Sequence, residues 1–358
     1  MPSTLNTSAA TTTPVGAPSL STRLTWRDTL KRCSLRWGVA RGTSRVDPGL
    51  YRIGAPTPAS PVLVTCNYRM TVDLVRRDLH GVDCWLLVLE TYGVNVWCAA
   101  GKGTFGSDEL MRRIVATHLA EFVDHETLVL PQFGAVGVSA PTVAELSGYR
   151  VVWGPVRSSD LPAFLAAGRK ATPEMRAVTF RLAERAVLAP VEFLGSLRYA
   201  LYAVSAALVL AVAGASVGAR AFLWLTAVLA LFPAALAYLL ASIAGGLITP
   251  LLLPWLPGRA FSVKGAVAGM ALALMTLTAL PGMFGMQSAW GWSAAVLSVS
   301  ALSSYVAVNF TGSTPYTSPS GVERELRAAI PAQAIALGLG ILCWTIAWYV
   351  AGQNMLGS

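Results

Sequence analysis

The segment Cys84–Leu89 reads Cys-Trp-Leu-Leu-Val-Leu, an unbroken apolar run. Such runs are typical of a strand in a parallel sheet that helices cover on both faces. The chain then passes through Glu90 and reaches Asn95, a residue suited to cap a helix. The residues that follow are Val-Trp-Cys-Ala-Ala-Gly-Lys, ending at Lys102. The stretch predicts a buried strand that leads into a short helix carrying one cysteine, Cys98.

Further strand and helix patterns alternate on either side of this stretch. The other strands expected are Val62–Cys66, Thr127–Leu130 and Arg150–Trp153. The helices expected are Arg69–Leu79, Ser107–Phe122, Thr142–Leu146 and Asp160–Ala167. Alternation of this kind indicates a Rossmann-like α/β sheet.

Ligands of such folds bind beyond the carboxyl ends of the strands. We therefore expect a binding site where three loops converge: Thr65–Tyr68, Glu90–Lys102 and Pro131–Val138.

Charge is distributed unevenly over the 358 residues. Residues 1–198 carry 22 of the 27 Lys and Arg and 16 of the 18 Asp and Glu, and the remainder of the chain is 160 residues of mostly apolar sequence. A soluble-type half followed by a membrane half is indicated. The predicted organisation is a mostly disordered arm at 1–45 with a short basic helix near Trp26–Trp37, an α/β domain at 46–170, a basic amphipathic connecting helix at 171–198 and an all-α transmembrane bundle at 199–358.

Uncharged stretches in the second half predict five spans: one each within 199–219, 221–258 and 328–358, and two within 265–322. A capping box of Ser320 and Glu323 predicts a short helix that begins at Ser320. With five spans, four cations lie on the inner side of the membrane and only Arg220 lies outside; the four are Arg259, Lys264, Arg324 and Arg327. With six spans, all five cations would lie outside. Because cations of membrane proteins favour the cytoplasmic side, five spans are predicted. We expect a multi-pass protein of the cytoplasmic membrane with the α/β domain in the cytoplasm and the C-terminus outside. The polar loop Asn309–Ala329 is either a docking element or a solvated turn.

Targeting and nucleic-acid signals are weak. Residues 1–20 have no basic start and no apolar core, so no secretory signal is predicted. The net charge of +9 comes without a long basic run interleaved with aromatics, so a membrane surface explains it better than nucleic acid.

Cys98 is the residue on which chemistry is expected to depend. The five cysteines form no C-x-x-C pair, which fits a reducing compartment. The dipole of a helix capped by Asn95 and the cation of Lys102 both favour the thiolate form of Cys98. Gly101 and Gly103 allow a flat ligand to approach the backbone closely. Trp97 adds an aromatic surface beside it. A buried packing cysteine is the alternative.

Three roles compete for such a thiolate. A nucleophile would need a histidine base, and no histidine stands in a catalytic motif. A zinc ligand would need further protein ligands. An axial ligand to a metal already held by a macrocycle needs only the one cysteine.

Asn95–Lys102, followed by Gly-Thr-Phe-Gly, resembles the cap-helix motif of the membrane-bound corrinoid proteins of mercury methylation. The region 60–165 also resembles the corrinoid domain of the large subunit of the acetyl-CoA-pathway corrinoid/iron–sulfur protein. The runs that carry this second resemblance are Val62–Thr65, Leu86–Glu90, Leu130–Gly134 and Val152–Pro155.

The resemblance implies a base-off, cobalamin-type corrinoid whose cobalt takes Cys98 as lower axial ligand. The cofactor-binding residues expected from the cap and the converging loops are Thr65, Asn67, Asn95, Val96, Trp97, Cys98, Ala99, Ala100, Gly101, Lys102, Gly103, Gln132, Phe133, Gly134 and Ala135. The implied partners are a ferredoxin-like [4Fe–4S] electron donor, a methyltetrahydrofolate-linked methyl donor in an anaerobe, and Hg(II) as substrate.

The leading hypothesis is therefore a corrinoid-dependent methyltransferase that moves a methyl group from cysteine-ligated cobalt to Hg(II), giving methylmercury. A second hypothesis is a membrane-tethered corrinoid methyl carrier of one-carbon metabolism with another acceptor. A third is a membrane sensor whose α/β domain binds a ligand without turnover.

Overall fold

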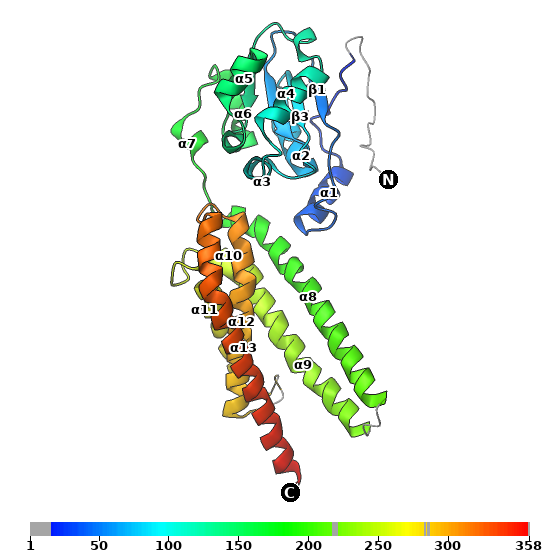
Figure 1. The fold of residues 1–358 in the computed structure, drawn as a ribbon, viewed down its shortest axis with the longest axis vertical. Helices are drawn as coiled ribbons and strands as arrows, with labels where there is room; N and C mark the ends of the chain where they lie inside the picture. Colours follow the sequence, from blue (N-terminus) through cyan, green and yellow to red (C-terminus); the bar gives the residue numbers. More distant parts are fainter. Residues whose placement is uncertain (1–15, 217–220, 283, 285–286, 357–358) are drawn as a thin grey trace. The chain divides into compact units, whose positions relative to one another are not determined.

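The computed structural model describes residues 16–216, 221–282, 284 and 287–356. The chain forms two compact units, residues 1–179 and 180–358, which are described separately below. Figure 1 shows the sheet of the first unit and the long helices of the second.

The first unit is built on a mixed five-stranded sheet. Its strands are β1 (Gly49–Ile53), β2 (Val62–Cys66), β3 (Cys84–Leu89), β4 (Thr127–Leu130) and β5 (Arg150–Trp153). Their order across the sheet is β1-β3-β2-β4-β5. The last four are parallel, and β1 joins the edge antiparallel to β3, with Tyr51 opposite Leu86. The four strands expected from the sequence are therefore all present, and the edge strand β1 was missed.

Helices cover both faces of this sheet (Figure 1). Val64 and Leu87 point into one core, which is filled by residues of α3 (Val96–Gly101), α4 (Ser107–Ala116) and α5 (Ala140–Ser147). Leu63 and Leu86, their neighbours in sequence, point into the other, with α2 (Arg69–Asp78) and α6 (Leu161–Ala166). Because successive strand residues face opposite sides, burial on both faces requires the continuous apolar runs seen in β2 and β3.

Residues 16–45 belong to the folded unit, so the disordered arm expected over 1–45 is wrong for this part; residues 1–15 lie outside the described residues. Leu20 N donates to Arg52 O at 2.8 Å and extends the sheet edge beside β1. The helix α1 (Trp26–Arg36) is closed by a capping box between Thr25 and Asp28.

An ion-pair cluster attaches α1 to α2. Asp28 lies 2.9 Å from Arg69 and 3.0 Å from Arg76, and both guanidinium groups also contact Asp73, at 3.0 and 2.8 Å. Asp73 is almost fully buried and Asp28 is 15% exposed, so these charges satisfy one another largely away from water.

The second unit is all helical. Its main elements are α8 (Leu182–Ser216), α9 (Ala221–Ile243), a π-helical turn η4 (Ala244–Ile248), α10 (Thr249–Leu252), α11 (Phe261–Ala279), α12 (Ala289–Asn309), η5 (Phe310–Ser313) and α13 (Pro319–Leu356). A separate connecting helix over 171–198 is not present. A short α7 (Pro173–Arg176) is followed by non-helical residues, and α8 then runs without interruption past residue 198, since Pro190 does not end it.

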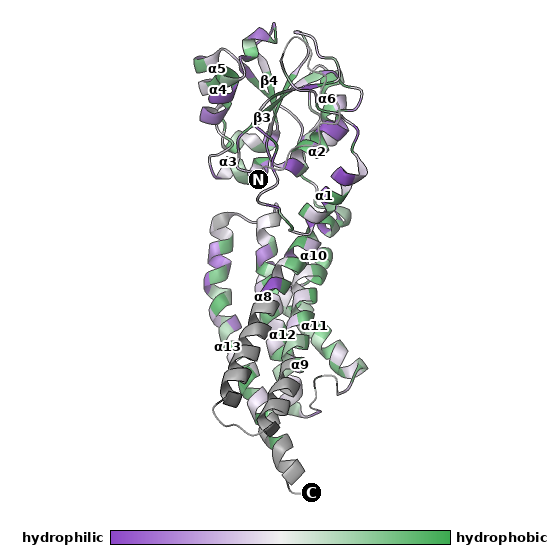
Figure 2. Ribbon diagram, turned by 90° about the vertical axis from the view of Figure 1, so that its right-hand side faces the viewer, coloured by the Kyte–Doolittle hydropathy of each residue, from purple (hydrophilic) through white to green (hydrophobic). Residues whose placement is uncertain are grey.

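Four helices among the described residues are long and apolar enough to cross a membrane: Phe232–Leu252, Phe261–Ala279, Ala289–Gly312 and Ser320–Ala347. Figure 2 shows the hydrophobic character of α11 and α12. The first expected span, 199–219, reaches into residues outside the described part, so the count of five spans stays a prediction. The last candidate helix begins at Ser320, where a helix start was predicted, but it continues into the span predicted from residue 328 and so includes the charged residues from Glu323 to Arg327.

Glycines allow α11 and α12 to pack closely. A Cβ added at Gly265 would lie 2.5 Å from Ala307 Cβ, and one at Gly269 would lie 2.7 Å from Ser303 Cβ. Ser303 Oγ donates to Gly265 O at 2.7 Å across the same contact. A small residue at every fourth position is the usual device for such close helix pairs.

Replacing Asp28 should release α1 from the first unit. Asp28→Asn removes one carboxylate from two arginines, a loss of about 1–3 kcal/mol, so amide exchange across residues 26–36 should quicken by about tenfold or more. Exchange mass spectrometry measures this directly. Asp124→Asn, at an exposed carboxylate, is the matched control, and an unchanged α1 in Asp28→Asn would contradict the role of the cluster.

Acid should have the same effect as that substitution. Burial by itself raises the pKa of Asp28, but hydrogen bonds from Thr25 and Arg76 outweigh it and hold the pKa below its ordinary value. A depressed carboxyl pKa stabilises the fold above the unfolded pKa of about 4 and ceases to do so as pH falls through the folded pKa. Exchange of α1 should therefore rise only below about pH 4.

Candidate functional site

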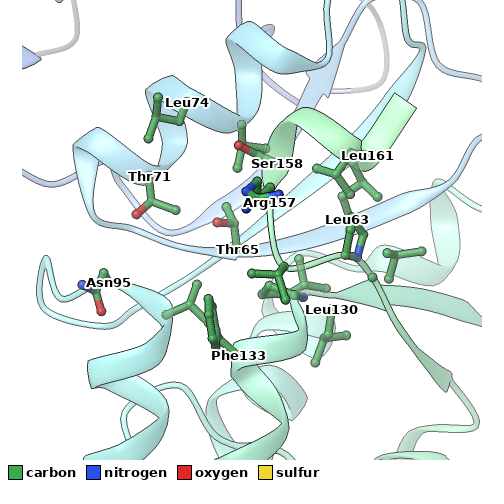
Figure 3. Close-up of a pocket in the computed structure, with 18 of the residues that line it drawn as sticks. Leu63, Thr65, Thr71, Leu74, Asn95, Leu130, Phe133, Arg157, Ser158 and Leu161 are labelled. Atoms are coloured by element: carbon green, nitrogen blue, oxygen red, sulfur yellow. The ribbon is translucent and has the colours of Figure 1, made fainter. Parts of the chain in front are cut away.

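A cavity lies at the carboxyl ends of the parallel strands. The chain runs from β2 to β3 on one side and then returns to β4 on the other, so β2 and β4 flank the point where the strand order reverses. Doubly wound sheets bind their ligands there. The cavity has a volume of about 270 Å³ and its lining includes Thr65 at the end of β2, Leu130 at the end of β4 and Gly154 after β5. Figure 3 shows Thr65, Asn95, Phe133 and Arg157 around it.

The short helix α3 borders this cavity. Asn95 Oδ1 accepts from Cys98 N at 2.9 Å and caps the helix, as its sequence position predicted. Asn95, Val96 and Trp97 line the cavity. The indole of Trp97 stacks on Phe133, with ring centroids 5.1 Å apart and planes only 5° from parallel. The pair forms one continuous aromatic surface from two separate loops.

Cys98 lies on the outer face of α3. Its side chain is exposed and does not line the cavity, while Ala99 and Ala100 on the inner face are buried in the core. Gly101 and Gly103 are also exposed, and a Cβ at either would meet open space. The thiol thus stands on an accessible, sparsely covered surface beside the cavity. The alternative of a buried packing cysteine is wrong for Cys98.

The turn before α3 has an unusual backbone. Tyr92 and Gly93 both have positive φ, +56° and +73°, and Val94 N donates to Thr91 O at 3.0 Å, as in a type I′ turn. A tyrosine pays a steric cost in this conformation, so neighbouring groups must hold it there.

Asn67 provides that restraint. Its Oδ1, fully buried, accepts from Thr91 N at 3.1 Å, Thr91 Oγ1 at 2.9 Å and Gly93 N at 3.0 Å. Its Nδ2 donates to Glu90 Oε1 at 2.6 Å, and that same oxygen accepts from Tyr92 N at 2.7 Å. One amide therefore connects the end of β2 to Glu90, Thr91 and Gly93, and through Glu90 to Tyr92.

A second carboxylate supports the end of β3. Glu109, buried in the first turn of α4, accepts from Glu90 N at 2.8 Å and from Arg113 at 2.7 Å. Residues of α4 and β2 thus fix the same strand end from two directions.

The residues predicted to bind the cofactor fall into three groups. Thr65, Asn95, Val96, Trp97 and Phe133 line the cavity. Those on the outer surface of α3 are Cys98, Gly101, Lys102 and Gly103. Those in neither place are Asn67, Ala99, Ala100, Gln132, Gly134 and Ala135.

Each residue of the third group either has a structural role or lies exposed away from the cavity. Asn67 holds the turn, and Ala99 and Ala100 fill the core. Gln132 hydrogen-bonds Arg176, at 3.0 Å from its guanidinium, and Ala135 is exposed. Gly134 packs so tightly that a Cβ would lie 2.6 Å from the Phe105 ring.

The part of the cavity lining that follows β5 was not predicted from the sequence. Pro155, Arg157, Ser158 and Leu161 line the cavity, together with Thr71 of α2. Ligands of such sheets bind beyond the carboxyl ends of the parallel strands, and the loop after β5 lies at such an end. Gly154–Leu161 could therefore have been predicted from its position directly after Arg150–Trp153.

The other cysteines of the first unit differ from Cys98. Cys66 and Cys84 are fully buried in the two cores, as expected for packing residues. Burial raises the pKa of the Cys66 thiol and raises that of Cys84 to about 12. Cys33, on α1, is exposed.

Comparison with known proteins shows that part of the first unit is similar to subunits of acetyl-CoA enzymes. Residues 29–165 match the family described as CO dehydrogenase/acetyl-CoA synthase delta subunit. That match ends before the second unit begins at Phe180.

The curated relatives are gamma subunits of the acetyl-CoA decarbonylase/synthase complex. The protein from Methanopyrus kandleri is 39% identical over 127 residues, which are 35% of this chain and 27% of the relative. The Methanosarcina acetivorans protein is 34% identical over 127 residues (34% and 26%), and that of Methanocaldococcus jannaschii is 32% identical over 139 residues (38% and 28%). The chain thus spans about a quarter of the length of these relatives.

These matches correct the assignment to the mercury-methylating corrinoid proteins, which is wrong. That assignment depended on the octet Asn95–Lys102, whereas the family match extends over residues 29–165 and leads to the acetyl-CoA enzymes. Hg(II) as substrate and methylmercury as product are withdrawn with it. The second resemblance, of the region 60–165 to the acetyl-CoA pathway, agrees with the comparisons.

Removing the Asn67 amide should loosen α3 without unfolding the sheet. Asn67→Ala leaves the buried donors of Thr91 and Gly93 without an acceptor, at about 1–3 kcal/mol, so amides of residues 91–99 should exchange about tenfold to a hundredfold faster. Hydrogen exchange measures this. Asn309→Ala, at an exposed amide of the second unit, is the control. Unchanged protection of α3 would contradict the proposed restraint.

Thiol reactivity should separate the cysteines by exposure. Near neutral pH, Cys33 and Cys98 should react rapidly with an aromatic disulfide reagent, while Cys66 and Cys84 should react only after denaturation, because buried thiols are both inaccessible and protonated. Cys33→Ala and Cys98→Ala should each remove one rapidly reacting group. Rapid reaction that persists unchanged in Cys98→Ala would show that its thiol is covered.

Proposed function

We propose that this chain is a membrane-tethered corrinoid methyl carrier of one-carbon metabolism. The observation that carries the proposal is the position of α3, which borders the cavity at the switch point of the sheet and presents an exposed thiol beside it. The relatives, named as subunits of the acetyl-CoA decarbonylase/synthase complex, support one-carbon metabolism as the setting.

The residues present fit a corrinoid. Among the described residues, no three His, Cys, Asp or Glu side chains come together to hold a metal ion, so a metal here would need most of its ligands from its own macrocycle. The outer face of α3 is open at Gly101 and Gly103, where a Cβ would meet no other atom, and this leaves room for a large planar ring next to Cys98. The resemblance to the acetyl-CoA-pathway corrinoid/iron–sulfur protein supports the same cofactor.

When bound, a corrinoid supplies a cobalt ion that accepts and releases a methyl group. The part of this chain is to hold and orient it. The Cys98 thiolate would be the lower axial ligand, a soft donor that raises electron density on the metal. Asn95 fixes the first turn of α3, and Asn67 fixes the turn before it, so the thiol is presented by a preorganised backbone. Trp97 and Phe133 keep water from the apolar wall of the cavity.

The proposed partners follow from the chemistry of the carrier. A carrier whose metal has been oxidised would need a low-potential electron donor to make it able to accept a methyl group again, and a ferredoxin-like [4Fe–4S] protein is suited to this. A methyltetrahydrofolate-linked system is the proposed methyl donor. We place the chain in the cytoplasmic membrane through its four candidate spans and the further span predicted at 199–219. With five spans, an α/β domain in the cytoplasm puts the C-terminus outside.

Visible spectroscopy tests the proposal on the full chain purified without oxygen and mixed with cobalamin. The expected product is a protein-bound, base-off cobalamin with the spectrum of a thiolate ligand. Cys98→Ala should retain binding but lose the thiolate signature, since the rest of the open face of α3, at Gly101 and Gly103, is unchanged. Cys98→His should replace it with a nitrogen-ligand spectrum. Cys33→Ala, which removes an exposed thiol far along the chain, should behave as the wild type.

Two results would overturn the proposal. One is cobalamin that stays free in solution in the presence of the intact chain. The other is a thiolate spectrum that is retained in Cys98→Ala, which would assign the ligand to another cysteine.

A further inference from the structure

The helix α1 presents its apolar residues to solvent. Trp26, Leu30, Cys33 and Trp37 follow one another at spacings of four, three and four residues, which places them on one face of the helix and its C-terminal cap. Trp26 is 68% exposed, Leu30 59% and Trp37 58%, and Cys33 is also exposed. We call these four residues the α1 stripe.

The opposite face of α1 holds it to the domain mainly by charge. Asp28 pairs with Arg69 and Arg76, and Leu35 is the one residue of the helix that is fully buried. A surface helix ordinarily buries its apolar face, because that burial is what stabilises it. In α1 the apolar face is exposed to solvent, and the charged residue Asp28 faces the domain. A contiguous exposed apolar row of this kind marks a surface that is covered in the working protein.

Cations border the α1 stripe. Arg27 places its guanidinium 5.3 Å from the centre of the Trp26 ring, and Lys31, Arg23 and Arg41 lie in or beside the same helix. Asp28, the acidic residue of α1, is engaged with the arginines of α2. The exposed face therefore combines two indoles with positive charge.

We propose that the α1 stripe lies in the headgroup layer of an anionic membrane and docks the α/β domain on the bilayer surface. Indole rings favour the membrane–water boundary, and basic helices with Trp and Leu on one face lie in the plane of that boundary. Anionic lipids attract the bordering Lys and Arg. The domain belongs to the same chain as the candidate spans, so a bilayer is present at high effective concentration.

The inference rests on the membrane location given in the proposed function and is independent of the corrinoid. It also assigns a role to the basic residues near the N-terminus, which the corrinoid site does not use.

A spin label at Cys33 tests the docking in the full chain. The chain carries Cys98→Ala and Cys343→Ala, and Cys66 and Cys84 are buried, so the nitroxide attaches at Cys33. The protein is placed in nanodiscs of phosphatidylcholine alone or with phosphatidylglycerol. Electron paramagnetic resonance then compares collisions with oxygen and with a water-soluble nickel chelate.

With phosphatidylglycerol present, the label should be shielded from the nickel chelate and open to oxygen. Arg27→Gln and Lys31→Gln should each lower the ratio of docked to undocked label about fivefold. Trp26→Ser combined with Trp37→Ser should abolish shielding. Leu146→Ser, at an exposed apolar residue of α5, is the control and should change nothing. The two charge variants alter only surface side chains, so they keep the test decisive if the tryptophan variant fails to fold.

Equal and full access of the nickel chelate in both lipids would overturn the proposal and leave the α1 stripe to a protein partner. Dipolar broadening between labels would assign it to a second copy of the chain and would overturn the proposal as well. A chain that does not enter nanodiscs contradicts both this inference and the membrane location, whereas an inserted chain with an exposed label contradicts this inference alone.

Discussion

The buried amide of Asn67 is the interaction on which the site depends. It accepts three hydrogen bonds from the turn Thr91–Gly93 and donates one to Glu90, so a single side chain at the end of β2 determines how the chain leaves β3. Without these bonds nothing in the turn itself favours the positive φ of Tyr92. The direction of α3, and with it the position of Cys98, follows from this contact between strand ends.

The same turn explains how an exposed thiol can stand on a rigid element. A helix as short as α3 has little stability of its own. It is held by Val96, Ala99 and Ala100, which are buried in the core, and by the close approach of the segment 132–138, where a Cβ at Gly137 would lie 3.0 Å from Ala100 Cα. The inner face of α3 is thus fully used in packing, and its outer face is left for a ligand.

The elements that were predicted correctly are those whose residues form a recognisable pattern along a short stretch of sequence. The strands β2 to β5 were located because buried parallel strands are short apolar runs with turn residues at their ends, and Asn95 was recognised as a cap from its type and position. The edge strand β1 was missed because its sequence, Gly-Leu-Tyr-Arg-Ile, contains a glycine and an arginine and so forms no continuous apolar run. Asn67 was assigned to the ligand since its partners lie more than twenty residues away. The helix α1 was predicted as a short basic helix near Trp26–Trp37, but its ion pairs to α2, which attach it to the sheet domain, join residues more than forty positions apart.

The two units contribute different features to the protein. The first holds the cavity, the thiol and the similarity to acetyl-CoA enzymes, and the second supplies candidate membrane spans packed through glycine. The central claim, that Cys98 is a metal ligand, is tested most directly by cobalt X-ray absorption on the cobalamin-loaded full chain. The account predicts a sulfur scatterer in the first shell of cobalt that disappears in Cys98→Ala. A first shell of only nitrogen and oxygen in the wild-type protein would contradict it.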